Sequence, residues 1–289
     1  MKKTLTIKKG LKTPIKILYT SDVHTSSSHF AEFLNLADKK DYDYLIVNGD
    51  ITPKVIFMRH NNLNVILRKQ EEYLKGEFTN LLKDFRSKNP NTEVFVDLGN
   101  DDFKFNRYFL QIQEGYLLHL LHMKTYELST EVSLIGYMCV PPTPFGIKDW
   151  EKPEKTGDFP FGSRLDGVIS VNGAIRENYV MNIHTEDTIE NDLKILSENI
   201  TKPFIFASHA PPFGTPLDMI SNTLHVGSKP IRDFVDSNAI NGNLVCSLHG
   251  HIHESPDISG SIVYKTNGIS CINIGQTNRD FHYLVLTII

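Results

Sequence analysis

The sequence predicts an α/β fold, because short apolar runs alternate along the chain with longer helical patterns. The chain has 289 residues, of which 40% are hydrophobic and 22% charged, as in an ordinary globular protein with a proper core. Alternation of this kind indicates β-α-β units whose strands are buried in a sheet. The sequence contains no internal repeat or low-complexity tract. We therefore expect one domain over residues 1–289.

The first part of the chain carries three predicted strands with helices between them. The strands cover residues 15–20, 44–47 and 94–96, which are rich in β-branched and aromatic side chains. Apolar side chains at helical spacing predict helices over about residues 30–37 and 63–85.

The middle of the chain, about residues 141–173, is rich in proline and glycine and has little periodicity. Its aromatic side chains, Phe145, Trp150, Phe159 and Phe161, indicate an ordered loop packed on the body. These aromatic groups either wall a substrate cleft or simply pack the loop.

Beyond this loop, the strand and helix pattern resumes. Thr185 is the predicted N-cap of a helix that covers residues 189–200. Strands are predicted over 204–207 and 244–248, with a helix between them that Ser228 could cap. Three closely spaced strands end the chain, at 261–265, 271–274 and 283–288.

The charge distribution argues against nucleic acid as a partner. The net charge is −4, although six lysines and no acidic residue lie among the first sixteen residues. The rest of the chain is therefore more acidic than the whole, and it has no global electrostatic footprint for duplex nucleic acid. We expect the basic start to be a solvated edge strand or arm.

Cysteine usage and hydropathy indicate the compartment. Cys139, Cys246 and Cys271 form an odd set without a CxxC pair, which argues for a reducing environment. Lys8 and Lys9 interrupt any apolar core of a signal peptide, and no run approaches the roughly 18 apolar residues of a membrane span. We expect a cytoplasmic protein without a membrane partner.

Polar residues that resemble metal ligands follow five of the predicted strands. In open α/β sheets, ligands bind beyond the carboxyl ends of the strands. Residues two apart on extended chain point the same way, so both members of an Asp-x-His or His-x-His pair can face one site. The glycines that precede several of these residues permit sharp turns and close approach. The five segments are Asp22-Val23-His24, Gly49-Asp50, Gly99-Asn100-Asp101-Asp102, Ser208-His209 and Gly250-His251-Ile252-His253.

The donor types in these segments predict two bound cations. Carboxylate, imidazole and amide groups together suit first-row divalent metals, whereas calcium prefers oxygen ligands alone. We expect manganese, with iron, zinc, nickel, cobalt or magnesium as the alternatives. Seven candidate ligands exceed what one tetrahedral ion can use, so two ions that share a carboxylate are the natural number. Such pairs bind both ends of an in-line displacement at phosphorus and supply a bound hydroxide as nucleophile.

The five segments, in this order, resemble the calcineurin-like metallophosphoesterases over about residues 15–275. The stretch from Gly227 to Ser255 resembles the small prokaryote-like members of that family. The resemblance implies a two-sheet β-sandwich flanked by helices, with the metals at the strand ends. It also implies the ligands: Asp22, His24 and His253 for one ion, Asn100, His209 and His251 for the other, and Asp50 as the bridge.

Two positions depart from the family pattern. The family usually places a histidine after the metal-binding asparagine to protonate the leaving group, and this chain has Asp101 there. An aspartate that orients this histidine is replaced by Pro53. Cations favour the ionised form of Asp101, so it is a poor acid. Without another proton donor, rates should depend steeply on the leaving group. His60 and His225 are the candidate substitutes, since both lie in predicted loops near the motifs.

These features predict a dinuclear metal-dependent phosphoesterase whose substrate is a small phosphodiester or activated phosphate ester. The alternative is a catalytically weak binding or scaffold protein on the same fold, which the missing acid favours and the full ligand set disfavours. A nuclease is disfavoured by the acidic body and by the lack of a basic, aromatic-interleaved stretch beyond the first sixteen residues.

Overall fold

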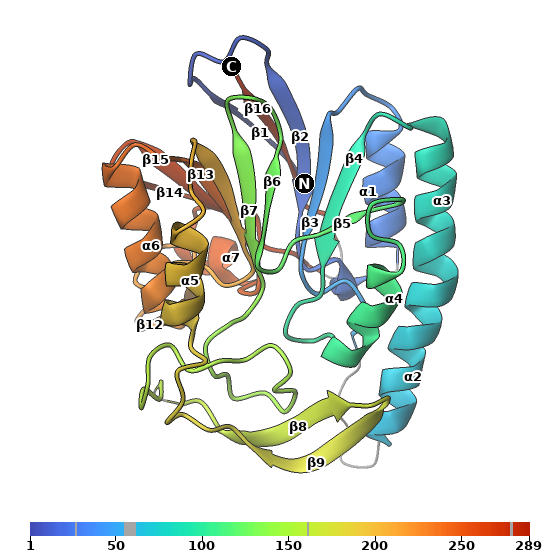
Figure 1. Cartoon of the computed structure of the whole chain (residues 1–289), viewed down its shortest axis with the longest axis vertical. Helices are drawn as coiled ribbons and strands as arrows, with labels where there is room; N and C mark the ends of the chain where they lie inside the picture. The colour runs from blue at the N-terminus through green and yellow to red at the C-terminus, as the bar shows by residue number, and fades with distance from the viewer. Residues whose placement is uncertain (27, 55–61, 161, 278–279) are drawn as a thin grey trace.

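The fold consists of two large sheets packed face to face, with helices on their outer faces (Figure 1). It was determined as a computed structural model, which describes residues 1–26, 28–54, 62–160, 162–277 and 280–289. The predicted α/β class and the helix-flanked β-sandwich are confirmed.

The first sheet has the strand order β1-β16-β2-β3-β4-β5. Strands β2 to β5 run parallel, whereas β16 is antiparallel to β2. The lysine-rich β1 is an edge strand with alternately exposed residues, as predicted. The strands are β1 (Lys2–Ile7), β2 (Ile15–Thr20), β3 (Tyr44–Asn48), β4 (Glu93–Asp97), β5 (His119–Leu120) and β16 (Tyr283–Ile288).

The second sheet has the order β14-β15-β13-β10-β7-β6. Its four inner strands are parallel, and both edge strands are antiparallel to their neighbours. Strand β7 was not predicted, although all five of its residues are buried. The strands are β6 (Lys124–Glu127), β7 (Ser133–Tyr137), β10 (Phe204–Ser208), β13 (Leu244–His249), β14 (Val263–Thr266) and β15 (Ile269–Asn273).

Helices α1 (His29–Ala37) and α3 (Thr79–Lys88) cover the first sheet, and α5 (Ile189–Ser197) and α6 (Lys229–Ile240) cover the second (Figure 1). The predicted long helix consists of α2 and α3 joined by a short π-helical segment, η2. No helix in the described ranges is long and apolar enough to cross a membrane. The remaining elements are η1 (Val23–Thr25), α2 (Leu63–Tyr73), η2 (Leu74–Phe78), η3 (Lys104–Arg107), α4 (Tyr108–Gln111), β8 (Asp166–Val171), β9 (Ala174–Val180), β11 (Met219–Ser221), β12 (Leu224–His225) and α7 (Ser255–Ser259).

One of the two predicted helix caps is wrong. Helix α5 is capped by Thr188, whose hydroxyl accepts a hydrogen bond from the Asn191 amide at 3.2 Å. The Thr185 hydroxyl instead accepts from the Asp187 amide at 3.1 Å and closes a turn before the helix. Ser228 caps α6 as predicted.

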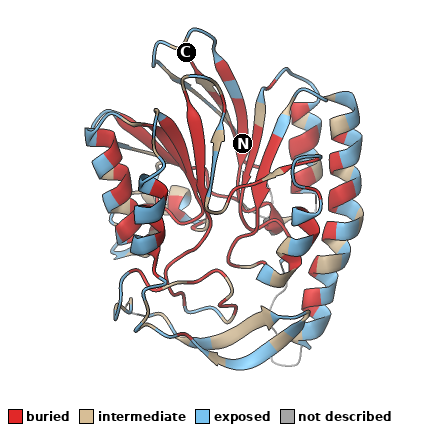
Figure 2. Cartoon of the chain, viewed as in Figure 1, coloured by how far each residue is buried: buried red, intermediate tan, exposed pale blue. Residues whose placement is uncertain are grey.

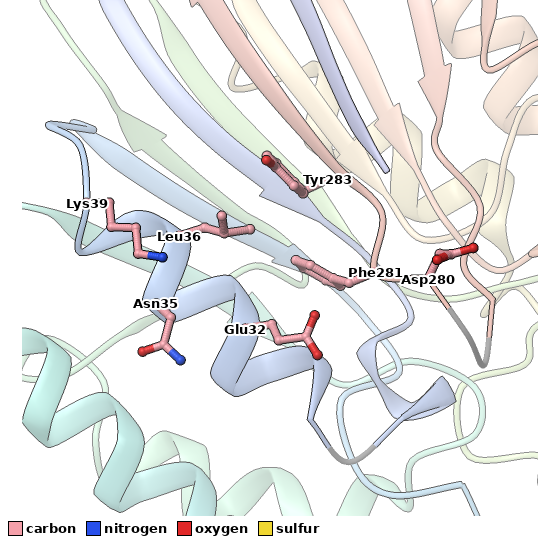
Figure 3. A pocket seen from close by; sticks show the side chains of 7 residues that line it. All are labelled: Glu32, Asn35, Leu36, Lys39, Asp280, Phe281 and Tyr283. Carbon is pink, nitrogen blue, oxygen red and sulfur yellow. The ribbon is translucent and has the colours of Figure 1, made fainter.

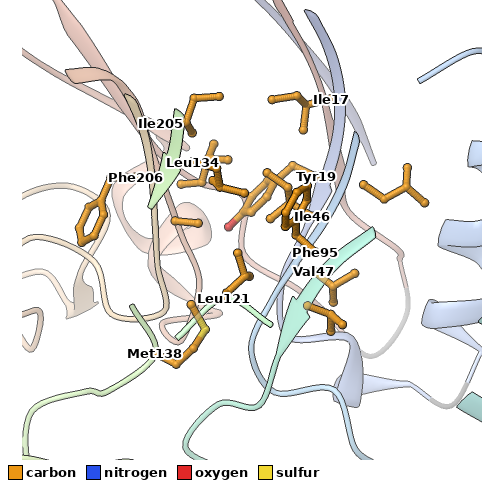
Figure 4. Packing of buried hydrophobic residues seen from close by; sticks show 14 of the residues in the cluster. Ile17, Tyr19, Ile46, Val47, Phe95, Leu121, Leu134, Met138, Ile205 and Phe206 are labelled. Atoms are coloured by element: carbon orange, nitrogen blue, oxygen red, sulfur yellow. The ribbon is translucent and has the colours of Figure 1, made fainter. Parts of the chain in front are cut away.

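The core lies between the two sheets. Buried residues run along the strands and over the sheet-facing sides of the helices (Figure 2). Ile17, Tyr19 and Ile46 of the first sheet face Leu134 and Ile205 of the second (Figure 4). The Tyr19 hydroxyl also donates to the backbone carbonyl of β13's last residue at 2.5 Å, which satisfies this polar atom in the core.

The proline- and glycine-rich segment packs against the body through buried side chains. Trp150 is fully buried, with its ring centroid 5.2 Å from that of His122, so it packs the segment rather than walling a cleft. Lys148 and Glu151 form a fully buried ion pair at 2.7 Å. The predicted loop extends too far, because residues 166–171 form β8, which pairs with β9.

Candidate metal centre and cleft

The carboxyl ends of β2, β3 and β4 from one sheet meet those of β10 and β13 from the other. Each of these strands is followed by one of the predicted ligand segments. Three ligand residues, Asp22, Asp50 and His251, have φ values of 55°, 52° and 66°. Left-handed backbone is uncommon outside glycine and clusters at functional sites. The chain therefore turns sharply at each strand end and points these side chains at one another.

Two glycines let the strand ends approach this closely. A Cβ atom on Gly99 would lie 2.3 Å from Asp50 Oδ1, and one on Gly250 would lie 2.6 Å from Asp22 Oδ2. Neither contact is sterically allowed, so any side chain at these positions would displace the ligands.

Four predicted ligands form a tight cluster. One donor atom from each of Asp22, His24, Asp50 and His253 lies within 4.8 Å of all the others. His253 Nε2 is 3.2 Å from Asp22 Oδ1, and His24 Nδ1 is 3.7 Å from Asp50 Oδ2. Both ring nitrogens of His24 are buried without a hydrogen-bond partner among the described residues. An unpaired buried imidazole beside two carboxylates fits a cation site.

A second group lies on the other side of Asp50. His209 Nδ1 is 2.8 Å from the Asn48 carbonyl, which only accepts, so the proton is on Nδ1. His209 Nε2 then faces Asn100 Oδ1 at 3.1 Å and Asp50 Oδ2 at 3.3 Å. The ring of His251 is 5.4 Å from that of His209. Burial opposes the charge of His209, but Asp50 outweighs it and raises the pKa of His209 to about 9, so a cation bound at Nε2 would displace a proton. With that proton removed, the group fits a second cation, and Asp50 lies adjacent to both groups.

The protonation states of Asp22, Asp50 and His24 suit metal ligands. Burial opposes ionisation of Asp50, but the neighbouring His209 and His24 outweigh it and lower the pKa of Asp50. In the same way, His253 overcomes the effect of burial and lowers the pKa of Asp22 to about 2. Burial lowers the pKa of His24, which remains a neutral imidazole. The carboxylates are thus charged and this histidine is uncharged, the forms that bind metals.

Two buried asparagines that the sequence reasoning missed hold the ligand loops. Asn48 Nδ2 donates to the backbone carbonyls of Ser208 at 2.9 Å and Leu248 at 3.1 Å, which ties β3 to the opposite sheet. Asn273 Nδ2 donates to the carbonyls of Gly250 at 3.3 Å and Ile252 at 3.0 Å. Each asparagine is the last residue of a buried strand, and this position is the sequence signal that could have identified it.

Asp101 lies at the edge of the cluster. Its backbone amide donates to Asp50 Oδ1 at 2.8 Å, and its carboxylate is 3.8 Å from His24 Nδ1. Lys54, which the sequence reasoning did not consider, pairs with Asp101 at 3.1 Å. Burial opposes the charge of Lys54, but Asp101 raises the pKa of this lysine. Asp101 and Lys54 therefore form an ion pair at the edge of the cluster.

Asp102 has a different role. It is fully buried and accepts hydrogen bonds from the amides of Ile51 at 3.0 Å, Thr52 at 2.9 Å and Gly99 at 2.9 Å. It therefore holds the turns that follow β3 and β4 and does not reach the ligand cluster.

The cluster opens into a cavity of about 560 Å³. Asp50, Asn100, Asp101, His251 and His253 line one side of it. The other side comes from residues 141–160, 162–163 and 213–229 and carries Phe145, Phe159, Phe213, Leu224 and His225.

The two candidate proton donors named with Asp101 have different outcomes. His225 lines the cavity, with Nδ1 2.7 Å from Asp218 Oδ1. His60 lies outside the described residues.

A second hollow, of about 450 Å³, lies between α1 and the start of β16 (Figure 3). None of the seven predicted ligands lines it. Its lining residues are Glu32, Asn35, Leu36, Lys39, Asp280, Phe281 and Tyr283. The cavity at the strand ends is therefore the candidate functional site.

Comparisons with known proteins agree with this fold. The uncharacterized protein MJ1162 of Methanocaldococcus jannaschii is 40% identical over 76 residues, which are 26% of this chain and about a third (34%) of that relative. One solved structure covers 91% of both chains with 16% identity and a TM-score of 0.55. The protein TT1561 of Thermus thermophilus has a TM-score of 0.50 and 14% identity over 91% of this chain and 90% of its own. These two structures share the fold.

The family assignment rests on a match to most of the chain. The sequence model of the calcineurin-like phosphoesterase family matches residues 15–255. This range runs from the first strand that precedes a ligand segment to just beyond the last ligand loop. This family implies a dinuclear centre of divalent metals, for which the clustered aspartates and histidines provide the donors. The chain belongs to the calcineurin-like phosphoesterase family.

Proposed function

We propose that the chain is a metal-dependent phosphoesterase that prefers phosphodiesters and activated phosphate esters. The cluster of Asp22, His24, Asp50 and His253 at the floor of a cavity carries this proposal. When bound, two divalent ions would neutralise charge on the phosphate and supply an activated water. We expect manganese to support activity best.

The ligand assignment follows the two groups on either side of Asp50. Asp22, His24 and His253 would hold one ion, because their donor atoms converge with those of Asp50. Asn100, His209 and His251 would hold the other, with Asp50 between the two.

The preference for diesters is supported by Asp101. Its carboxylate lies between the ligand cluster and the cavity, where a phosphate would bind. A monoester dianion carries one more negative charge than a diester, and two unit charges 4 Å apart repel by about 1–4 kcal/mol in solvent-exposed to surface environments. Lys54 offsets part of this repulsion. A diester should therefore be favoured by about tenfold or more.

The walls of the cavity indicate an apolar organic group on the substrate. Phe145, Phe159 and Leu224 line it and are 57%, 43% and 44% exposed. Large apolar side chains grouped at the mouth of a polar site are typical of ligand-binding clefts. Aryl esters should therefore bind better than small alkyl esters.

The test is a matrix of metals and substrates. The chain is stripped with a chelator, reloaded with Mn²⁺, Mg²⁺, Zn²⁺ or Ni²⁺, and assayed with bis(4-nitrophenyl) phosphate and 4-nitrophenyl phosphate. These substrates share one leaving group, and methyl 4-nitrophenyl phosphate, which lacks the second aryl ring, separates the charge preference from binding to the apolar wall. We expect metal-dependent hydrolysis that is faster for the diester. Absence of hydrolysis with every metal would favour the binding or scaffold alternative.

A further inference from the structure

We propose that His225, held by the buried carboxylate of Asp218, protonates the leaving group of the substrate. The inference rests on the proposed phosphoesterase function and adds the proton donor that Asp101 cannot supply. Asp101 is an anion paired with Lys54, so it has no proton to give.

The Asp218 carboxylate lies behind His225, which lines the cavity. It is fully buried and accepts four hydrogen bonds. Oδ1 accepts from the Thr215 amide at 2.9 Å and lies 2.7 Å from His225 Nδ1. Oδ2 accepts from the amides of Gly214 at 3.0 Å and Gly227 at 2.9 Å. These four contacts fix the orientation of the carboxylate.

The local backbone is shaped around this carboxylate. Strands β11 and β12 form a hairpin in which His225 pairs with Met219, next to Asp218 in the chain. A Cβ atom on Gly227 would lie 2.8 Å from Asp218 Cβ and 2.6 Å from the Pro211 carbonyl. The close approach that lets the Gly227 amide reach Asp218 therefore requires glycine.

This contact determines the tautomer of His225. An ionised carboxylate can only accept a hydrogen bond. The proton in this hydrogen bond is therefore carried by Nδ1 of His225. Nε2 remains to exchange a proton with the cavity, which the half-buried side chain lines together with Asp50 and Asn100. A carboxylate on Nδ1 also stabilises the imidazolium, as in the triads of hydrolases.

His225 is also distinguished from the other histidines of the cavity. Within the described part of the chain, three histidines line it: His225, His251 and His253. The last two belong to the ligand loop that follows β13, whereas His225 comes from the opposite wall. It is therefore the described imidazole that is placed to act on the substrate without acting as a metal ligand.

The proposed step transfers one proton. The attacking water releases one proton to solvent as its oxygen forms a new P–O bond, while the bond between phosphorus and the leaving oxygen breaks. The electron pair of the broken bond stays on the leaving oxygen, which takes the Nε2 proton of the His225 imidazolium and departs as a neutral alcohol. His225 is left as a neutral imidazole that keeps its Nδ1 proton and donates it in a hydrogen bond to Asp218, and solvent restores the Nε2 proton. General acid catalysis of this kind contributes about 10²–10⁴ in rate.

The kinetic test is the dependence of rate on the leaving group. Metal-loaded wild type and His225→Gln are assayed with methyl 4-nitrophenyl, methyl phenyl and methyl benzyl phosphate. 4-Nitrophenolate departs without a proton, whereas benzyl alcohol requires one. We expect His225→Gln to slow benzyl ester hydrolysis by about 10²–10⁴-fold and 4-nitrophenyl ester hydrolysis by less than about tenfold. The matched control is His119→Gln, because His119 is also half-buried beside a carboxylate, Glu93, but lies outside the cavity.

A spectroscopic readout tests the role of Asp218 as a positioning residue. In ¹⁵N spectra of metal-free protein at alkaline pH, His225 should carry its proton on Nδ1, and Asp218→Asn should remove that preference. Asp218→Asn should also reproduce the leaving-group selectivity of His225→Gln. A proton on Nε2 in the wild type would overturn the proposal.

The kinetic outcomes separate this inference from the proposed function. If wild type hydrolyses the diesters and His225→Gln slows all three equally or none, then His225 is not the acid and the phosphoesterase assignment stands. If wild type hydrolyses none of them with any metal, the proposed function fails and the role of His225 fails with it.

Discussion

Five strand ends supply every predicted ligand on one side of the cleft, whereas the facing wall is made from two connections, one with residues 141–160 and 162–163 and the other with residues 213–229. On the strand-end side, the ligands lie one to four residues beyond the end of a buried strand, and three of them are directed by left-handed backbone. On the facing wall, partners come from distant parts of the chain. The Lys229 amide, for example, donates to Glu154 Oε1 at 2.6 Å.

This contrast explains which residues the sequence reveals. Parallel strands that end at one edge bring their next residues together whatever the loops do, so Asp-x-His and Gly-His-x-His are readable as a site. Wall contacts depend on how a long connection folds back. Asp218 and His225 meet only because a hairpin forms, and Lys54 reaches Asp101 only in the folded chain.

The same reasoning applies to the fold. Strands such as β2 and β13 were predicted because polar residues mark their ends, and α2–α3 because its apolar stripe is long. Strand β7 was missed because its fully buried run has no alternation and no ligand after it. The α5 cap was misplaced by three residues because both Thr185 and Thr188 are good caps, and only the turn closed by Asp187 distinguishes them.

The largest expected effect is on the strand-end side. Asp50→Asn removes the charge that both ion groups share. Loss of a residue that only hydrogen-bonds to a metal ligand lowers metal affinity by about 10–100-fold. Asp50→Asn weakens the binding of two ions directly, so it should lower activity by about 10²–10⁴-fold at fixed Mn²⁺. Hydrolysis of bis(4-nitrophenyl) phosphate measures this. Asp84→Asn, at an exposed carboxylate paired with Lys88, should leave the rate unchanged.

Substitutions in the facing wall should affect the stability of the fold. Lys148→Met leaves Glu151 buried without its counter-ion, which costs about 3–5 kcal/mol in free energy of unfolding. Lys155 lies in the same connection as Lys148 and forms an exposed ion pair with Glu190 of α5. Lys155→Met should lower the free energy of unfolding by less than about 1 kcal/mol. Urea denaturation followed by circular dichroism compares the two. Equal effects would mean that the buried pair does not anchor the wall.

A smaller effect is expected behind the ligand loop. Asn273→Ala releases the carbonyls of Gly250 and Ile252, so His251 and His253 lose their fixed geometry. Mn²⁺ affinity should fall by about 10–100-fold, as calorimetric titration would show. Asn241→Ala, at the exposed end of α6, is the matched control and should bind Mn²⁺ as wild type does. Unchanged affinity in Asn273→Ala would show that the loop holds its shape without this residue.

The smallest expected effect is a gain. Asp101→His removes a negative charge, frees Lys54 to pair with phosphate and places an imidazole beside the cluster. Pro53 cannot orient that imidazole, so hydrolysis of benzyl phosphate, whose leaving group requires a proton, should rise by about tenfold, to 10²-fold at most. Asp101→Asn separates the effects, because it removes the charge without adding a proton donor. Loss of all activity in a folded, metal-loaded Asp101→His variant would instead make Asp101 a working part of the site.

The central claim is that the strand ends form a two-metal centre. The most direct measurement is the stoichiometry of Mn²⁺ at saturation, determined by elemental analysis of protein that has been stripped of metal, titrated and passed through a desalting column. The account predicts two ions per chain for wild type and fewer for Asp50→Asn. Saturation of wild type at one ion, or at none, would contradict it.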